Sequence, residues 1–441
     1  MSGSEVGRLP ANDPGCGWLA QLPARASRPA LRGDERTDWA IVGAGYTGMA
    51  AARQLAAVQP HARIVLIEAN RAAEGASARN SGFLVDATLN EGTGTAADIE
   101  TFKQKYRLNL AAIAEVKAQV ERFGIDCDWD GAGKLYAARH PRYGEKLDRF
   151  AALLGELGME HEVLGADALA ARTGTAFYTM AVWTKTSVLL QPAKLARGLL
   201  DALPPAVDLF EGSPILAWAS DTGGYRLTTP EGTLRARNVI MAVNGFMPEL
   251  GIERNRSFAL LLTASLSRPL TQAEYLRLGA PAPYGVLSAD AMGATVRLTR
   301  DRRLLVRNTC EVPRDLSLDA EALAQRHRSN GRALAARFPT LDPAILTHHW
   351  SGIVSLSLNG HHVFGRLGEG LFVAGCYNAN GIGTANLLGR EIANLAAGQD
   401  SDLISLIKAR SRPRALPPQP LLGWGARLRL MRDAWRGRSE Q

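Results

Sequence analysis

The sequence predicts an α/β protein of two domains (α+β over the whole chain), and three observations support this prediction. Its 441 residues exceed a single domain of ordinary size. Its composition is 46% hydrophobic and 21% charged, enough apolar material for a large core, which excludes a disordered or fibrous protein. From residue 37 onward, short apolar runs alternate with stretches of helical spacing, a pattern typical of strands connected by helices.

The predicted elements follow an irregular start. Residues 1–33 are rich in Pro, Gly, Ala and Ser and are expected to form an arm on the surface. Strand-like runs separated by Pro and Gly lie between 257 and 307. Apolar runs predict buried strands at 39–42, 64–67, 239–243 and 371–375. Helical spacing predicts helices at 49–58, 101–123, 142–157, 191–203, 321–338 and 385–397.

The net charge of +8 comes almost entirely from the end of the chain. Residues 408–441 hold nine Lys or Arg against two acids, which leaves the preceding residues near +1. A nucleic-acid enzyme usually carries positive charge on its folded surface, so no nucleic-acid partner is predicted. The chain has no apolar run of transmembrane length and no secretory leader pattern, and its four cysteines lack metal-ligand spacing. We expect a cytoplasmic protein with reduced thiols and no metal site.

A glycine-rich turn stands between the first predicted strand and the first predicted helix. Gly43, Gly45 and Gly48 form a GxGxxG motif, which permits a tight turn, close approach of the backbone to a pyrophosphate, and close packing of helix on strand. The N-terminus of the following helix supplies free N–H groups. Glu68 ends the next strand, where a carboxylate accepts the hydroxyls of an adenosine ribose. The pattern predicts a Rossmann-like dinucleotide site.

A loop of small residues, Gly-Ala-Ser-Ala-Arg-Asn-Ser-Gly, follows at 75–82. It can lie flat against a cofactor larger than NAD and offer it backbone N–H groups. It can equally be an ordinary flexible loop, and the residues alone leave both interpretations open.

The glycine motif, Glu68 and the 75–82 loop together resemble the FAD-dependent D-amino-acid oxidase superfamily, also called the DAO or glycine oxidase group. The loop is most similar to the gamma-glutamylputrescine oxidase-like branch. Residues 237–245 and 371–389 resemble the family's later flavin-domain segments, in the same order. Between them, Trp350-Ser351-Gly352, Ser357, Asn359 and Gly365 resemble a further family segment. The resemblance covers about residues 37–400.

The resemblance implies a domain division and a set of cofactor contacts. The FAD domain would be assembled from 34–100, 186–250 and 350–405. The substrate domain, built on a mixed sheet, would come from 101–185 and 251–349. A basic tail would follow at 406–441. With the glycine motif, the expected FAD contacts are Gly43, Gly45, Tyr46, Thr47, Gly48, Glu68, Ala76, Ser77, Arg79, Asn80, Ser81, Gly82, Asn244, Gly245, Asn380, Gly381, Ile382, Gly383 and Thr384.

The sequence departs from the family at some positions. Asn359 and His362 stand where the family has Asp and Pro. The 75–82 loop has no histidine, and Cys310 lacks the family's context for covalent attachment, so non-covalent FAD is expected. Cys376, in the closing loop, is expected to be a buried structural thiol.

The resemblance implies oxidation of an amine or amino acid by hydride transfer from the carbon next to nitrogen to flavin N5, after which water hydrolyses the imine. A gamma-glutamylated polyamine or a small secondary amine is a plausible substrate. A neutral amine needs no strong protein base, so the catalytic residue stays unknown, with Trp350, His349 and Tyr377 as candidates. Arg297, Arg307 and Trp350 are candidate substrate contacts; solvated strand faces and a core tryptophan are the alternatives.

The electron acceptor is oxygen or a quinone or other carrier. Some oxidases of the family use a lysine near the flavin to activate oxygen. This chain has eight lysines and none between Lys194 and Lys408, so the substrate-domain strands are expected to supply none. This spacing favours a dehydrogenase slightly.

The sequence of the tail predicts a linker at 410–420 followed by a basic amphipathic helix. Its apolar residues recur every three or four positions, at Leu421, Trp424, Leu428, Met431 and Trp435, with arginines around them. The helix suits a peripheral contact with the inner face of an anionic membrane. It also suits docking on the body of its own or a partner subunit, and the residues alone favour this second interpretation.

Two other functions remain compatible with the residues. One is an NAD-linked dehydrogenase. The other is a basic-tailed adaptor that binds a membrane or nucleic acid on a nucleotide-binding scaffold, against which the near-neutral charge of the body argues.

Overall fold

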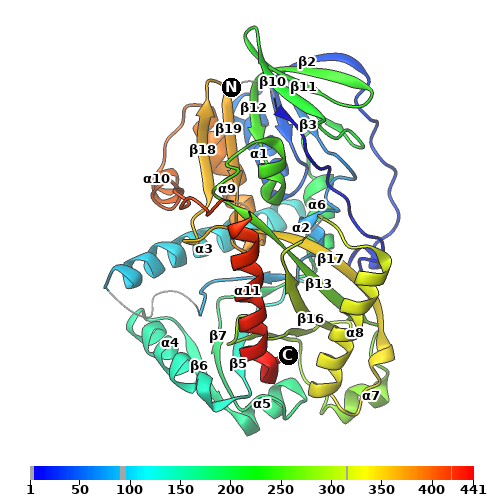
Figure 1. The fold of residues 1–441 in the computed structure, drawn as a ribbon, viewed down its shortest axis with the longest axis vertical. Helices are drawn as coiled ribbons and strands as arrows, with labels where there is room; N and C mark the ends of the chain where they lie inside the picture. Colours follow the sequence, from blue (N-terminus) through cyan, green and yellow to red (C-terminus); the bar gives the residue numbers. More distant parts are fainter. Residues whose placement is uncertain (1–3, 90–95, 314–315, 419) are drawn as a thin grey trace.

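A computed structural model of the chain describes residues 4–89, 96–313, 316–418 and 420–441. It contains two large sheets, one above the other in Figure 1, each flanked by helices. The upper half contains the glycine motif and the lower half contains the helices coloured yellow and turquoise. This arrangement confirms the predicted α/β architecture with a second, mixed sheet.

The first sheet has the order β1-β10-β11-β12-β2-β3-β9, and β19 joins it by pairing with β12 and β18. Its parallel strands are β2 (Gly33–Val42), β3 (Ile64–Ile67), β9 (Val207–Phe210), β12 (Gly232–Met241) and β19 (Leu371–Gly375). Its antiparallel strands are β1 (Ser4–Glu5), β10 (Ala217–Asp221), β11 (Gly224–Thr228) and β18 (Val363–Gly368). The predicted buried strands are therefore neighbours in one sheet.

Helices cover this sheet and bury its apolar face. They are α1 (Tyr46–Val58), α3 (Ala96–Phe123), α6 (Pro192–Asp201), α9 (Gly381–Ala396) and α10 (Asp402–Ala409). Their apolar residues share one core with β2, β3 and β12. The short helix α2 (Ala76–Arg79) precedes a two-stranded ribbon of β4 (Phe83–Leu84) and β8 (Val188–Leu189).

The second sheet has the order β17-β13-β16-β15-β14-β5-β7-β6 and is mixed, because β14 and β5 run parallel while the other pairs are antiparallel. Its strands are β5 (Lys134–Ala138), β6 (His161–Gly165), β7 (Met180–Thr184), β13 (Phe258–Ser267), β14 (Tyr284–Ser288), β15 (Thr295–Leu298), β16 (Leu304–Glu311) and β17 (Leu346–Leu356). The helices beside it are α4 (Gly144–Glu156), α5 (Ala166–Thr173), α7 (Gln272–Arg277) and α8 (Ala320–Arg337). The domain boundary expected at residue 350 falls inside β17.

One strand of the second sheet does carry a lysine. Lys134, on β5, is buried and forms an ion pair with the buried carboxylate of Asp86. It also donates to the hydroxyls of Thr184 and Ser187, at 2.8 and 3.0 Å. The expectation of no lysine on these strands was wrong, because the lysine-free interval between Lys194 and Lys408 does not include β5, β6 and β7, which come from the 101–185 part of the expected substrate domain. This lysine nevertheless serves as the partner of a buried acid.

The arm is more deeply buried than its composition suggests. The side chains of Trp18 and Leu31 are almost inaccessible, and Asp13 is 7% exposed. Asp13 accepts a hydrogen bond from Arg79 at 2.8 Å, and both side chains of this ion pair are buried. The main-chain N–H of Ser351, on β17, donates to the other carboxylate oxygen of Asp13 at 2.9 Å.

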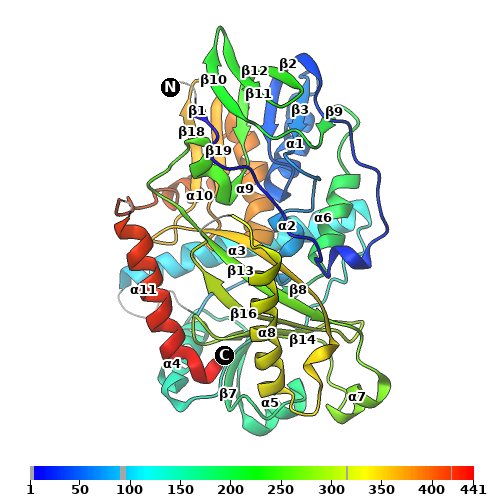
Figure 2. The same cartoon turned by 45° about the vertical axis from the view of Figure 1, so that its right-hand side comes forward.

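The tail contains the predicted helix, α11 (Leu421–Arg436), and is held at both ends. Before the helix, Arg256 donates to the carbonyl of Pro413 at 2.7 Å. After it, the buried Glu440 accepts the main-chain N–H of His140 at 2.8 Å. Figure 1 shows α11 running from the level of the first sheet to that of the second, and Figure 2 shows it along the outer edge of the molecule.

The apolar stripe of α11 does not pack on the body of the chain. Its large residues are exposed: Leu421, Trp424, Leu428, Met431 and Trp435. The tail thus docks on its own subunit through its ends, while its apolar stripe remains open. Within the residues described, no helix combines the length and the apolarity needed to cross a bilayer.

Replacing Asp13 by alanine is expected to lower the free energy of unfolding by about 3–5 kcal/mol, because the buried guanidinium of Arg79 loses its counter-charge. Equilibrium urea unfolding measures this loss. The matched control is Asp34→Ala, which breaks an exposed ion pair with Arg235 at 3.5 Å and should cost less than about 1 kcal/mol. Equal losses for the two variants would contradict the assigned role of the buried pair.

Candidate active site

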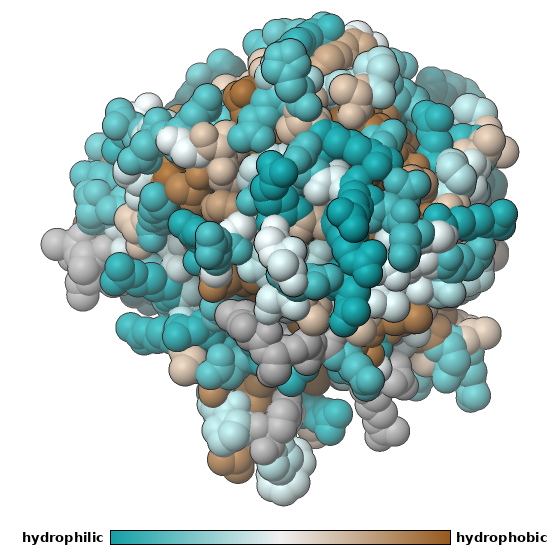
Figure 3. Space-filling view, turned by 90° about the horizontal axis from the view of Figure 1, so that it is seen from above, coloured by the Kyte–Doolittle hydropathy of each residue, from teal (hydrophilic) through white to brown (hydrophobic). Residues whose placement is uncertain are grey.

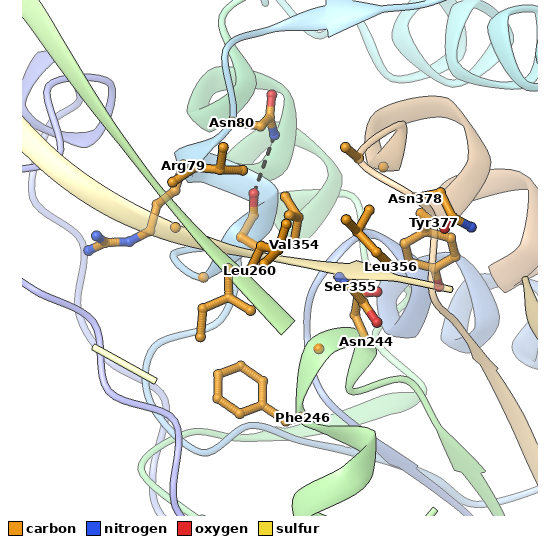
Figure 4. Close-up of a pocket in the computed structure, with 18 of the residues that line it drawn as sticks. Arg79, Asn80, Asn244, Phe246, Leu260, Val354, Ser355, Leu356, Tyr377 and Asn378 are labelled. Atoms are coloured by element: carbon orange, nitrogen blue, oxygen red, sulfur yellow. Dashed lines mark hydrogen bonds between the residues drawn. The ribbon is translucent and has the colours of Figure 1, made fainter. Parts of the chain in front are cut away.

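A cavity of about 970 Å³ lies where the parallel strands of the first sheet end. The residues after β2, β3 and β12 border it, as expected for a ligand site at the carboxyl edge of a parallel sheet. Strands β13, β16 and β17 of the second sheet line its other side. Figure 4 shows β17 crossing this pocket, with the side chains of two of its own residues, Val354 and Leu356, drawn along the strand and Tyr377 of the closing loop further along.

The glycine turn has the geometry that its motif predicts. Gly43 has a φ of 100°, and a Cβ there would lie 2.8 Å from the carbonyl oxygen of Ala242. A Cβ on Gly48 would overlap the carbonyl oxygen of Gly43, and one on Gly45 would lie 2.9 Å from Oγ of Ser77. Side chains are therefore excluded where the backbone must approach a pyrophosphate and where α1 packs on the turn.

Glu68 lies beside this turn with its carboxylate held in place. Its two oxygens accept the N–H groups of Ala44 and Asn70, at 2.8 and 3.0 Å. Burial raises the pKa of Glu68, while these hydrogen bonds oppose the rise. The carboxylate borders the cavity, so its remaining acceptor capacity faces the position expected for a ribose.

The 75–82 loop is a hydrogen-bonded turn. The hydroxyl of Ser77 accepts the N–H of Tyr46 at 3.0 Å, which ties the loop to the start of α1. The Asn80 side chain donates to the carbonyl of Ser77 at 2.8 Å and accepts the N–H of Gly82 at 2.9 Å. These bonds favour the cofactor-lining interpretation over a flexible loop. The guanidinium of Arg79 points away from the pocket in Figure 4, toward the arm.

Helix α9 begins beside the same cavity. Asn380 occupies the N-cap position but its side chain does not cap the helix; it donates to the side chain of Asn109 at 2.9 Å. The side chain of Asn378 accepts the N–H of Ser357 at 2.9 Å, so it is not a cap either. The first turn of α9, which borders the cavity at Gly381, therefore keeps its N–H groups free of side-chain caps. This end of the helix favours negative charge.

Most of the expected FAD contacts border the cavity. Those that do are Gly43, Gly45, Tyr46, Thr47, Glu68, Ala76, Ser77, Arg79, Asn80, Ser81, Asn244, Gly245, Asn380, Gly381 and Ile382. Those that lie behind it are Gly48, Gly82, Gly383 and Thr384. The glycines in the second group serve packing: a Cβ on Gly82 would overlap the Arg297 guanidinium, and one on Gly383 would lie 2.7 Å from Leu84.

Four residues form a row across the second sheet. Thr295, Arg307, Ala264 and Trp350 are successive cross-strand partners, so their side chains share one face of the sheet, and all four border the cavity. Nη2 of Arg307 donates to the Thr295 hydroxyl at 2.7 Å, which holds the guanidinium in place. The indole N–H of the buried Trp350 donates to the carbonyl of Arg79 at 2.9 Å.

Arg297, expected as a substrate contact, does not border the cavity. Its guanidinium donates to the carbonyl of Leu190 at 2.6 Å and, more weakly, to those of Ser81 and Gly82. It also lies over the ring of Trp18. All three of these hydrogen bonds come from Nη1, which faces the carbonyls behind the cofactor loop, so Arg297 supports that loop from behind.

The histidines are not part of the cavity lining either, among the residues that the structure describes. His349, a catalytic candidate, stacks on His327 of α8 with ring centroids 4.5 Å apart, on the opposite face of β17 from Trp350. Burial lowers the pKa of His362 to about 3, and its ring contacts the carbonyl of Cys376 at 3.1 Å. No group of acidic, histidine or cysteine ligands suited to a metal occurs in the described residues.

Tyr377 borders the cavity and bonds to the hydroxyl of Thr47. Burial raises its pKa, so its phenol stays protonated over the physiological range. Tyr377 thus connects the closing loop to the start of α1.

Sequence reasoning missed two walls of the cavity. The arm contributes residues 8–12, which carry no motif. The tail contributes the inner face of α11, including Leu422, Ala426 and Leu430. The i, i+4 spacing of these three residues was the available signal for a second apolar face.

Replacing Glu68 by glutamine is expected to weaken binding of the dinucleotide, expected to be FAD, roughly tenfold or more. The amide has one acceptor oxygen and directs its NH2 group at a main-chain N–H, so one hydrogen bond is lost along with the negative charge facing the ribose. Fluorescence titration of the stripped protein with FAD measures the change. Glu74→Gln is the control, because Glu74 pairs with Arg71 outside this cavity. Unchanged affinity in Glu68→Gln would exclude the ribose contact.

Comparison with known proteins agrees with this site. Residues 38–395 match the DAO family, described as FAD dependent oxidoreductase. Gamma-glutamylputrescine oxidoreductase of Escherichia coli (strain K12) is 27% identical over 381 residues, covering 82% of this chain and 84% of that protein. The probable oxidoreductase OrdL of Rhizobium meliloti (strain 1021) is 26% identical, covering 88% of this chain and 90% of that protein. The crystal structure of glycine oxidase from Geobacillus kaustophilus has the same fold, with a TM-score of 0.70 at 22% identity, covering 83% of this chain and 96% of that chain.

The family match spans most of the chain and confirms the resemblance found in its sequence. The match assigns the chain to this family and to neither of the two alternatives, an NAD-linked dehydrogenase and a non-catalytic adaptor. The chain belongs to the DAO family of FAD-dependent oxidoreductases, and it is an enzyme that binds FAD.

Proposed function

We propose that this enzyme oxidises the C–N bond of an amine or amino acid that carries a carboxylate. Arg307 is the observation that carries the proposal: its guanidinium is oriented by Thr295, and the residue borders the cavity in the same cross-strand row as Trp350. A guanidinium binds a carboxylate through paired, charge-assisted hydrogen bonds. The names of the relatives, gamma-glutamylputrescine oxidoreductase and glycine oxidase, support an amine substrate with such a group.

A gamma-glutamylated polyamine is the substrate that we favour, and a small secondary amine is the second candidate. The cavity extends from Glu68, at the ribose end, to Arg429 and Asp433 on α11. FAD would fill the part of this cavity next to Glu68, which leaves the part next to Arg307 and α11 for the substrate. Arg307, Arg429 and Asp433 line that part with charges of both signs, which suits a substrate that has both an amine and a carboxylate.

Bound FAD supplies the acceptor, at its N5 atom, for a hydride from the carbon next to the substrate nitrogen. The residues of the chain bind and orient. Glu68 would accept hydrogen bonds from the ribose hydroxyls, the N–H groups after Gly45 would face the pyrophosphate, and the first turn of α9 would favour negative charge on the reduced cofactor. Arg307 fixes the substrate carboxylate. The C–H bond breaks as the C=N bond forms, a proton leaves the nitrogen to water, and water then hydrolyses the imine to a carbonyl compound and an amine or ammonia.

We infer that the cofactor is held without a covalent bond. Cys310 is the cysteine that borders the cavity, and burial raises its pKa. Burial also raises the pKa of Cys376, to about 11. Thiols in this state are poor nucleophiles toward a flavin.

The acceptor of the electrons is proposed to be a quinone or another carrier, with oxygen as the alternative. Among the residues described, no lysine borders the cavity, so the ammonium group that activates oxygen in some flavin oxidases has no counterpart here. The four cysteines are free, which fits a reducing cytoplasm.

Replacing Arg307 by methionine is expected to raise about 100-fold the concentration of a carboxylate-bearing amine that half-saturates anaerobic flavin reduction, because a buried charge-assisted pair is worth a few kcal/mol. Anaerobic bleaching of the flavin, titrated with amines that have or lack a carboxylate, measures it. The control is Arg300→Met, which removes an exposed arginine paired with Asp130 outside the cavity. Equal bleaching by both kinds of amine in the unmodified enzyme would contradict the carboxylate clamp.

The rate of anaerobic flavin reduction is expected to rise with pH up to the pKa of the substrate amine and then level off. Only the neutral amine reacts, and raising the pH removes its extra proton. Burial raises the pKa of Tyr46, Tyr377 and Cys310 in the cavity, so none of them titrates near pH 7. Two substrates whose amine pKa values differ should give profiles displaced by that difference; a shared profile would reveal a protein base instead.

A further inference from the structure

Helix α11 presents large apolar side chains to solvent. Trp424, Leu428, Met431 and Trp435 are between 60% and 68% exposed. With Leu421, they make up half of the large apolar residues that are exposed in the described chain. At 3.6 residues per turn, their spacing places all of them in one stripe along the helix. The stripe faces outward from Trp424 to Trp435, whereas Leu421, at its start, also borders the cavity. By contrast, the end of the molecule seen in Figure 3 is mostly hydrophilic, with only small, separate apolar patches.

The opposite side of the same helix borders the active-site cavity. Leu422, Ala426 and Leu430 line the cavity from this side, together with Arg429 and Asp433. No residue of α11 is buried. A helix of this length is marginal in water and normally depends on packing of an apolar face. Here the chain holds the helix at its two ends, and the large side chains of its outer apolar face remain mostly exposed.

Arginines border the outer stripe. Arg427 lies on one side of it and Arg432 and Arg436 on the other, as the helical spacing requires. Asp433 is the one acid in the helix, and it is already paired with Arg429 and Arg432. The tail as a whole carries +7 of the net charge of +8. An apolar stripe flanked by arginines is complementary to a surface that is apolar inside and negatively charged outside.

The charges beside the stripe distinguish between two partners that could each cover an apolar face: a second copy of α11 and a lipid bilayer. A second copy of α11 would meet the stripe with further arginines and no free acid, and like charges across a helix pair are destabilising. An anionic bilayer offers phosphates to the arginines and an interface in which tryptophan is favoured.

We infer that the outer face of α11 docks on the surface of an anionic membrane. The tryptophans, Leu428 and Met431 enter the headgroup boundary, and the arginines contact lipid phosphates. Because the inner face of α11 borders the cavity, docking places the wall of the active site directly against the bilayer. This inference extends the proposed function at one point: a lipid-soluble quinone in that bilayer would lie next to the cavity.

The test is flotation of the full-length, FAD-loaded enzyme with two kinds of vesicle, one of phosphatidylcholine alone and one containing about a third phosphatidylglycerol. The enzyme is expected to float with the anionic vesicles, to be released by 0.5 M salt (a Debye length of about 4 Å), and to remain unbound with neutral vesicles. The double variant Trp424→Ser/Trp435→Ser should reduce the bound fraction at least tenfold, as should Arg427→Gln/Arg436→Gln.

The matched control is Val163→Ser/Leu276→Ser, which removes two apolar side chains of similar exposure, 59% and 58%, from other elements. It should bind like the unmodified enzyme. Flavin absorbance of each variant reports that it is folded.

Three outcomes would overturn the inference: no binding to anionic vesicles, equal binding to neutral ones, or a dimer that depends on Trp424 and Trp435 and does not bind vesicles. Sedimentation velocity identifies the dimer. Amine-driven bleaching without vesicles tests the proposed reaction separately, so failure of docking leaves that result intact.

Discussion

One buried ion pair joins the three parts of the chain that enclose the flavin site. Asp13 of the arm accepts from Arg79 of the cofactor loop, and its other oxygen accepts from the main chain of Ser351 on β17. Arg79 in turn donates to the carbonyl of Ser351 at 3.2 Å. Two charges excluded from water must satisfy each other, which fixes the arm, the loop and the second sheet in one arrangement. The cavity exists because these three segments meet around it.

The ion pair between Asp13 and Arg79 also determines which side of the 75–82 loop faces the cavity. With its guanidinium directed toward the arm, Arg79 offers the cavity only its backbone and aliphatic part. Two indoles complete the support: Trp18 donates to the carbonyl of Asn80 and Trp350 to that of Arg79, both at 2.9 Å. The rings of Trp18 and Trp350 meet edge to face at 6.2 Å. The loop is rigid because its outward carbonyls are all engaged behind it.

Features set by local geometry could be predicted from the sequence. The turn at Gly43 and the acid at Glu68 follow from what a strand, a turn and a helix require within some thirty residues. Features set by distant partners could not. Arg297 and Arg307 both occur on substrate-side strands, but only the fold shows that Arg297 meets the carbonyl of Leu190 while Arg307 meets the cavity. Nothing in the sequence around His349 indicated that its ring would stack on that of His327. The amphipathic character of α11 could be predicted directly from its sequence. That its inner face lines the cavity could not, because this depends on contact with β16, more than a hundred residues earlier in the chain.

The burial of the four cysteines affects how fast peroxide can oxidise them. Burial raises the pKa of all four thiols, to about 11 for Cys127 and Cys376. Peroxide attacks thiolates far faster than thiols, so each of these sulfurs is poorly reactive even where Cys310 borders the cavity. Whenever reduced flavin leaks electrons to oxygen, hydrogen peroxide forms at that wall. Because burial keeps these sulfurs as thiols, peroxide formed there is expected to oxidise the four cysteines only slowly.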